Sequence, residues 1–154
     1  MACALLALPR VAEAAEAAGA LPTARSVAGG SETVLLAEDE ESVRELVRET
    51  LEAKGYKILA CENAEAALQM AAAHTGTIDM LITDLVMPGM SGRELAKRLC
   101  AVRPQAKVLY LSGYTEDVLA HPGMFEPGTS FLQKPFTLQR LARKVREVLQ
   151  GKPE

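Results

Sequence analysis

The sequence has little cysteine, little net charge and no apolar run long enough to cross a membrane. Its three cysteines, Cys3, Cys61 and Cys100, are odd in number and form no C-x-x-C pair, so the sequence predicts neither a disulfide framework nor a cysteine-based zinc site. We expect all three to be small apolar side chains in a reducing cytoplasm.

The formal net charge is −3, which is too weak a field to predict binding to nucleic acid or to an anionic membrane surface. No segment has the pattern of a helix-turn-helix or of a basic recognition helix, so direct nucleic-acid binding is not expected. The apolar N-terminal stretch is cut by Pro9-Arg10, lacks a basic segment before it and falls short of the about 20 residues that span a bilayer. We therefore expect a cytoplasmic chain without membrane insertion.

The chain divides by composition into a tail and a domain. Residues 1–32 are rich in alanine and contain hardly any large apolar residue after Val11, so we expect a linker or tail. Residues 33–150 hold the apolar runs of one globular domain, and 151–154 form a short C-terminal tail.

Within the domain, short apolar runs alternate with segments of helical period, which predicts βαβ units around a five-stranded parallel sheet with helices on both faces. The expected strands are 34–37, 56–60, 78–83, 107–111 and 130–133. Asn63, Ser91 and Thr137 are expected to cap the helices that they precede. A short helix is expected at about 116–120, ended by His121-Pro122-Gly123.

The helical periodicity also predicts which side chains point inward. The residues expected to face the sheet are Val43, Leu46, Val47, Thr50 and Leu51 in the first helix, Leu95, Leu99 and Val102 in the third, and Leu138, Leu141, Val145, Val148 and Leu149 in the last. The residues expected to face solvent are Arg44, Glu45, Arg48 and Glu49 in the first helix and the basic run Arg140, Arg143, Lys144 and Arg146 in the last.

Polar residues follow four of the expected strands at their C-terminal ends, where parallel sheets bind ligands. They are Glu38, Asp39 and Glu40 after the first strand, Asp84 after the third, Ser112 after the fourth and Lys134 after the fifth. Carboxylates crowded together repel one another unless a hard cation lies among them, and an oxygen-lined site suits Mg²⁺. Asp84 is placed to accept a phosphoryl group as an acyl phosphate, with Lys134 and Ser112 completing the pocket.

The same strand ends carry motifs that resemble the receiver domain of two-component response regulators. The motifs are Val34-Leu35-Leu36-Ala37-Glu38-Asp39-Glu40, Asp84 with Met87-Pro88-Gly89-Met90-Ser91-Gly92, Leu111-Ser112-Gly113-Tyr114, and Phe131-Leu132-Gln133-Lys134-Pro135-Phe136. Four such fragments in order, each at a strand end, are strongly specific. The resemblance implies a flavodoxin-like, doubly wound sheet of strand order 2-1-3-4-5.

The resemblance also implies a phosphorelay function. Asp84 would take a phosphoryl group from the phosphohistidine of a sensor histidine kinase or a histidine phosphotransfer domain, in a Mg²⁺-dependent reaction that the receiver itself catalyses. Asp39 would bind the metal directly and Glu38 through water, and the backbone carbonyl of Val86 would supply a further ligand. The protein would be a signalling switch rather than an enzyme acting on a separate substrate.

The switch residues implied by the resemblance are Ser112, which would move toward the phosphorylated Asp84, and Phe131, which would change rotamer with it. Lys134 would pair with the acyl phosphate, and Lys134-Pro135 would be a cis bond, a minority state for X-Pro at about 5%.

Two departures from the family pattern leave alternatives open. Glu38 stands where the family usually has aspartate, and Phe131 where many members have tyrosine. A pseudo-receiver that binds partners without phosphorylation is one alternative. An aspartate-nucleophile phosphatase is another, although Val86 stands where its second acid would be.

The N-terminal stretch suggests the context of the domain. Leu8-Pro9-Arg10-Val11 resembles the last strand of a histidine-kinase ATPase domain. The hypothesis is therefore the C-terminal receiver of a hybrid sensor kinase, or a stand-alone relative with a residual linker.

Overall fold

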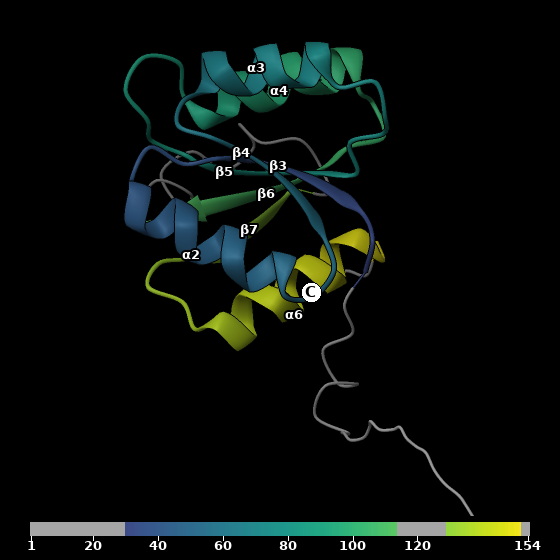
Figure 1. Cartoon of the computed structure of the whole chain (residues 1–154). Coiled ribbons are helices and arrows are strands. Elements are labelled where there is room, and N and C mark those ends of the chain that lie inside the picture. The colour runs from purple at the N-terminus through teal and green to yellow at the C-terminus, as the bar shows by residue number, and fades with distance from the viewer. Residues whose placement is uncertain (1–29, 114–128, 152–154) are drawn as a thin grey trace, which may run out of the picture.

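The computed structural model describes residues 30–113 and 129–151 (Figure 1). The short helix expected at 116–120, the break at 121–123 and the linker up to residue 29 lie outside the described residues. The described elements, in chain order, are β3 (Thr33–Ala37), α2 (Glu41–Glu52), β4 (Lys57–Cys61), α3 (Ala64–Ala73), β5 (Met80–Asp84), α4 (Gly92–Val102), β6 (Lys107–Ser112), β7 (Ser130–Gln133) and α6 (Leu138–Leu149).

The strands form one parallel sheet in the order β4-β3-β5-β6-β7, which confirms the predicted 2-1-3-4-5 topology. Helices α3 and α4 cover one face of the sheet, while α2 and α6 lie side by side on the other (Figure 1). Because both faces are covered, the central strands are apolar on both sides: Leu35 packs in one core cluster, and its neighbours Val34 and Leu36 pack in the other.

The predicted helix starts are confirmed by side-chain caps. The Asn63 side chain accepts a hydrogen bond from the Ala66 amide at 2.7 Å, and the Ser91 hydroxyl accepts from the Glu94 amide at 3.2 Å. The Thr137 hydroxyl accepts from the backbone amide three residues later at 3.1 Å. These caps satisfy amide donors that have no partner within the helix.

Three residues predicted to face the sheet are exposed instead: Leu46 at 42%, Val102 at 69% and Leu138 at 46%. Val102 is the last residue of α4 and Leu138 the first of α6, so each lies one turn beyond the nearest buried leucine of its helix. On α2 the buried stripe is centred on Val47 and Leu51, which turns Leu46 toward solvent. The apolar faces are therefore narrower than the periodicity predicts.

The prediction of a solvated basic face on α6 is wrong for Lys144 and Arg146, although Arg140 and Arg143 are exposed. Lys144 is buried, and burial lowers its pKa. Arg146 pairs with Glu32 at 2.7 Å, and its guanidinium lies 5.9 Å from the centre of the Tyr56 ring. A long cationic side chain covers apolar surface with its stem, and Arg146 also has an acidic partner near the start of the described chain.

None of the helices within residues 30–113 and 129–151 combines the length and the apolar character needed to cross a membrane.

Candidate functional site

The pairing register of the sheet brings the polar strand ends together. Ala37 of β3 pairs with Thr83 of β5, so the residues that follow them, Glu38 and Asp84, lie at the same level of the sheet edge. Ser112 is the last residue of β6 and pairs with Gln133, after which the chain continues to Lys134. The edge predicted from the sequence to form the site therefore gathers Glu38, Asp39, Asp84, Ser112 and Lys134.

Three of these residues form a carboxylate cluster. Glu38, Asp39 and Asp84 each offer an oxygen, and the three oxygens lie within 4.8 Å of one another. Glu38 is fully buried, Asp84 is half-buried and Asp39 is exposed, so the cluster opens to solvent on the Asp39 side. Hard oxygen ligands in this number, with room for water on the open side, fit a magnesium ion.

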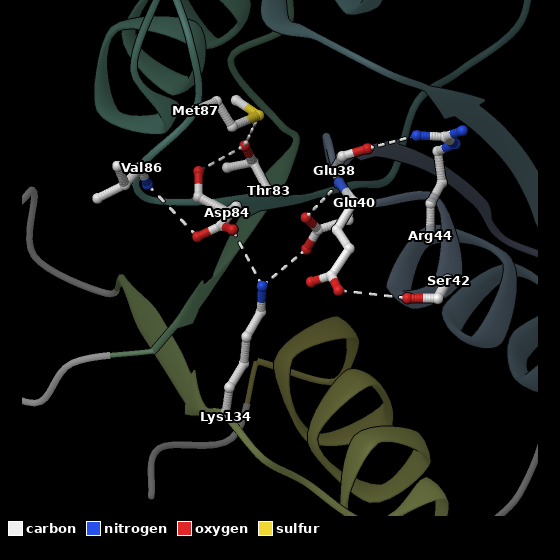
Figure 2. A network of polar contacts seen from close by, with 9 residues as sticks. All are labelled: Glu38, Glu40, Ser42, Arg44, Thr83, Asp84, Val86, Met87 and Lys134. Atoms are coloured by element: carbon white, nitrogen blue, oxygen red, sulfur yellow. Dashed lines mark hydrogen bonds and ion pairs between the residues drawn. The ribbon is translucent and has the colours of Figure 1, made fainter.

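Lys134 joins the cluster from the end of β7 (Figure 2). Its ammonium nitrogen lies 2.9 Å from Glu38 Oε2 and 3.0 Å from Asp84 Oδ2. Burial by itself lowers the pKa of Lys134, but the hydrogen bonds to Glu38 and Asp84 outweigh it, and the pKa is raised. Burial raises the pKa of the Glu38 carboxyl, and the hydrogen bond from Lys134 opposes that rise.

Glu38 is held by further donors besides Lys134. The Glu40 amide donates to Glu38 Oε1 at 3.1 Å, and the Arg44 guanidinium donates to the Glu38 carbonyl at 2.8 Å. Arg44 was predicted to face solvent, but it is half-buried and turns back along α2 to the acidic loop. The Glu40 carboxylate accepts from the Ser42 hydroxyl at 3.3 Å and does not belong to the carboxylate cluster (Figure 2).

The loop after Asp84 is shaped by short contacts to its backbone. The Thr83 hydroxyl donates to the Asp84 carbonyl at 3.0 Å, and the Val86 amide lies 3.4 Å from Asp84 Oδ1. Gly89 has φ +81, a conformation that favours glycine, which explains the Pro-Gly turn of the motif. Val86 is 66% exposed at the mouth of the site.

Ser112 and Phe131 lie on the neighbouring strands β6 and β7. Ser112 is buried, and its carbonyl accepts from the Lys134 amide at 2.8 Å. The Phe131 ring stacks on Tyr110, with ring centres 5.5 Å apart. The Lys134-Pro135 peptide is cis, as the family resemblance implied.

Sequence reasoning missed Arg44 and Thr83 as parts of the site. Arg44 has the helical period of a solvated face, and nothing in that pattern distinguishes it from Arg48, which pairs with glutamates along α2. The one available signal in the sequence was the position of Arg44, which lies in the first turn of α2 directly after the acidic residues Glu38, Asp39 and Glu40. Thr83 was recognised as a strand residue, but its hydroxyl bond to a backbone carbonyl depends on local geometry.

Comparison with known proteins places the chain among receivers. The sequence profile of the response regulator receiver domain matches residues 34–146. Sensor kinase CckA of Brucella abortus (strain 2308) is 37% identical over 121 residues, which cover 79% of this chain and 13% of the kinase. Response regulator receiver protein CpdR of the same strain is 30% identical over 116 residues, which cover 75% of this chain and 95% of that protein.

Solved structures similar to this chain are also receiver domains and response regulators. The crystal structure of the receiver domain from hybrid histidine kinase CckA is 37% identical, with a TM-score of 0.66, covering 77% of this chain and 99% of that one. Response regulator TrrA of Thermotoga maritima, crystallised with Mg²⁺-BeF, is 31% identical, with a TM-score of 0.65, covering 76% and 98%. This chain therefore spans a small part of the length of the kinase and nearly the whole of the single-receiver relatives.

Proposed function

Because the chain belongs to the response regulator receiver domain family, we propose that Asp84 accepts a phosphoryl group from a phosphohistidine in a Mg²⁺-dependent reaction. The donor is a sensor histidine kinase or a histidine phosphotransfer domain. The observation that carries the proposal is the cluster of Glu38, Asp39 and Asp84 oxygens within 4.8 Å, with Lys134 against two of them. TrrA, a relative of the same fold, was crystallised with Mg²⁺-BeF, which supports the choice of metal.

In the proposed step, a carboxylate oxygen of Asp84 attacks the phosphorus atom of the phosphohistidine. The new O–P bond forms as the N–P bond breaks, and the imidazole leaves with the bonding pair and takes up a proton. Asp39, Asp84 and the Val86 carbonyl would hold the ion, with Glu38 in contact through water. Bound there, Mg²⁺ supplies neutralising charge for the phosphoryl oxygens. Lys134, already beside Asp84, would donate to a phosphoryl oxygen.

Formation of the acyl phosphate would then change the positions of Ser112 and Phe131. An added phosphoryl group brings about two negative charges and three acceptor oxygens to the sheet edge, and the hydroxyl of Ser112 on the next strand is a suitable donor. Phe131, whose ring stacks on Tyr110 of the neighbouring strand, would change rotamer as Ser112 moves toward the phosphoryl group. Receiver domains are signalling switches, and we assign that role to residues 33–150, with 1–32 as linker and 151–154 as tail.

The protein in which this receiver works is either a hybrid sensor kinase, as the identity to CckA favours, or a single-receiver protein such as CpdR. The alternative is a pseudo-receiver, which binds partners without phosphorylation, and the experiment has to distinguish it from a phosphoacceptor. No observation favours an aspartate phosphatase, because the residue two positions after Asp84 is an exposed valine.

The test is incubation with Mg²⁺ and acetyl phosphate, followed by intact mass. We expect a gain of one phosphoryl group that is absent in Asp84→Asn and after chelation of the metal. Asp79→Asn is a matched control, because the Asp79 carboxylate accepts from the Thr33 amide at 2.8 Å near the start of β5, the strand whose last residue is Asp84. A folded wild-type chain that takes up no phosphoryl group and does not bind beryllofluoride would be a pseudo-receiver.

A further inference from the structure

Thr83, the residue before Asp84, has a buried hydroxyl that the proposed reaction does not use. Thr83 is 0% exposed, and its Oγ1 lies 3.0 Å from the Asp84 carbonyl oxygen and 4.0 Å from the Met87 sulfur (Figure 2). A threonine hydroxyl has one proton to donate, and a carbonyl oxygen is a better acceptor than a thioether sulfur. The Thr83 hydroxyl therefore donates to the Asp84 carbonyl.

The start of α4 closes over this hydrogen bond. A Cβ at Gly92 would lie 2.0 Å from the Asp84 carbonyl oxygen and 3.1 Å from Thr83 Oγ1. The backbone of α4 is thus packed against the carbonyl on this side and leaves no space for a water molecule that could donate in place of the hydroxyl. Without the hydroxyl, the Asp84 carbonyl would have to turn to reach another donor, because a buried acceptor without a partner is costly.

A turn of that carbonyl would disturb the loop that follows Asp84. The peptide that contains the carbonyl also contains the Leu85 amide, which donates to the Leu111 carbonyl at 3.1 Å. One planar peptide is therefore held at its oxygen by Thr83 and at its nitrogen by β6. The next amide, that of Val86, lies 3.4 Å from Asp84 Oδ1, beyond the usual length of a hydrogen bond. A small rotation of the peptide is enough to break this contact.

We propose that Thr83 is a positioning residue for phosphoryl transfer, because its hydroxyl fixes the peptide that follows Asp84. The fixed peptide keeps the Val86 amide beside Asp84 Oδ1, while Lys134 contacts Oδ2. The carboxylate that attacks phosphorus is then oriented from both sides. The inference rests on the proposed function, since it concerns the reaction at Asp84, and it assigns Thr83 no contact with the phosphoryl group.

The experiment compares Thr83→Val and Thr83→Ser with the wild-type chain. Valine keeps the branched shape and the strand preference of threonine but lacks the hydroxyl, whereas serine keeps the hydroxyl and lacks the methyl group. Thr33→Val is the matched control, because Thr33 is also a buried strand threonine and begins β3, at the opposite edge of the parallel sheet from Asp84. Urea denaturation gives the stability of each variant.

Two quantities are measured: the position of the Val86 amide signal in the metal-free ¹⁵N spectrum, and the rate of phosphorylation at saturating Mg²⁺ as a function of acetyl phosphate concentration. In Thr83→Val we expect the Val86 signal to shift and the maximal rate to fall about tenfold, because a misplaced nucleophile loses rate. The acetyl phosphate concentration that gives half the maximal rate should change by less than about twofold. Thr83→Ser and Thr33→Val should keep the wild-type signal and a maximal rate within about threefold of the wild type, whatever their stabilities.

Three results would overturn the positioning role. The first is a Thr83→Val variant with the wild-type maximal rate. The second is a Thr83→Ser variant as slow as Thr83→Val, which would assign the effect to packing of the methyl group. The third is an equal loss of rate in Thr33→Val, which would mean that reduced stability alone slows the reaction. A wild-type chain that accepts neither a phosphoryl group nor beryllofluoride overturns the proposed function, whereas the metal-free Val86 signal tests the loop contact on its own.

Discussion

Replacing Gly92 by alanine should destabilise the domain and disturb Asp84. Gly92 is the first residue of α4, and a Cβ at this position would lie 2.0 Å from the Asp84 carbonyl oxygen and 3.0 Å from its carbon. The obstacle is backbone, and it is held by the pairing of Asp84 with Leu111 across β5 and β6. The Gly92 amide also donates to the Leu85 carbonyl at 3.0 Å, so the helix start is fixed to the same loop.

Whether Gly92→Ala stabilises or destabilises the domain depends on two opposing free energies, the gain in helix propensity and the steric cost of the added carbon. Alanine in a helix gains at most about 1 kcal/mol over glycine, and less at the first position. Forcing an extra carbon into a packed site costs about 1–3 kcal/mol, more when the neighbour is backbone. We expect Gly92→Ala to lower the free energy of unfolding by about 1–3 kcal/mol in urea denaturation. Phosphorylation by acetyl phosphate should slow, because the Asp84 backbone has to move to admit the methyl group.

Gly113→Ala is the matched control for stability. It also adds one methyl group, directly after strand β6, but apart from its chain neighbours no atom of residues 30–113 and 129–151 lies within 4 Å of the new Cβ. Its free energy of unfolding should stay within about 0.5 kcal/mol of the wild type. A Gly92→Ala variant as stable as the wild type and phosphorylated at the same rate would refute the steric argument.

Two further predictions concern long-range contacts of arginines. Arg103→Ala should lower the free energy of unfolding by about 2 kcal/mol in urea denaturation, and Arg103→Lys should recover less than half of it, because one ammonium does not reproduce the guanidinium fork. The bonds at stake join Arg103 to the carbonyls of Ala71, His74 and Gly76, at 2.9, 2.8 and 2.6 Å. The hydrogen bond from Arg146 holds the pKa of Glu32 below its usual 4.5, so the ionised pair stabilises the fold fully above that pH. The wild type should therefore be more stable than Glu32→Gln at pH 7, and this advantage should shrink as pH falls below about 4.5 through the lowered pKa, measured by denaturation at each pH.

Local signals in the sequence were enough to predict the strands, the helix caps and a parallel sheet. Each strand is a short apolar run followed by polar or turn-forming residues. Each predicted helix cap, such as Asn63, accepts a hydrogen bond from a backbone amide three residues later in the chain. Parallel pairing follows from the crossover helices, and it brings the strand ends to one edge, whereas the order of the strands was implied by the family resemblance. This is why the cluster of Glu38, Asp39 and Asp84 was predictable from residues that lie far apart in the chain.

The errors concern side chains whose partners are distant or whose helix position is terminal. Arg146 has the period of a solvated face, and its acidic partner Glu32 lies 114 residues earlier. Arg44 also lies on the face of its helix that the periodicity predicts to be solvated. Its partner is the Glu38 carbonyl, which the turn between β3 and α2 brings within reach of the guanidinium. Periodicity reports the direction in which a residue leaves its helix. It does not report what stands there, and a long cationic side chain finds a partner well outside the stripe that the period defines.

The charge balance of the site fits the binding of one divalent cation beside Lys134. When Glu38, Asp39 and Asp84 are ionised, Lys134 leaves two formal negative charges in the cluster, the number that one divalent cation neutralises. The two oxygens of Asp84 face different neighbours, because Oδ2 contacts Lys134 while Oδ1 lies nearest the Val86 amide (Figure 2). A phosphoryl group on Asp84 adds about two negative charges and requires the ammonium to turn toward the new oxygens. Lys134 contacts Glu38 as well as Asp84, so one carboxylate partner would remain within its reach when the ammonium turns toward the phosphoryl oxygens.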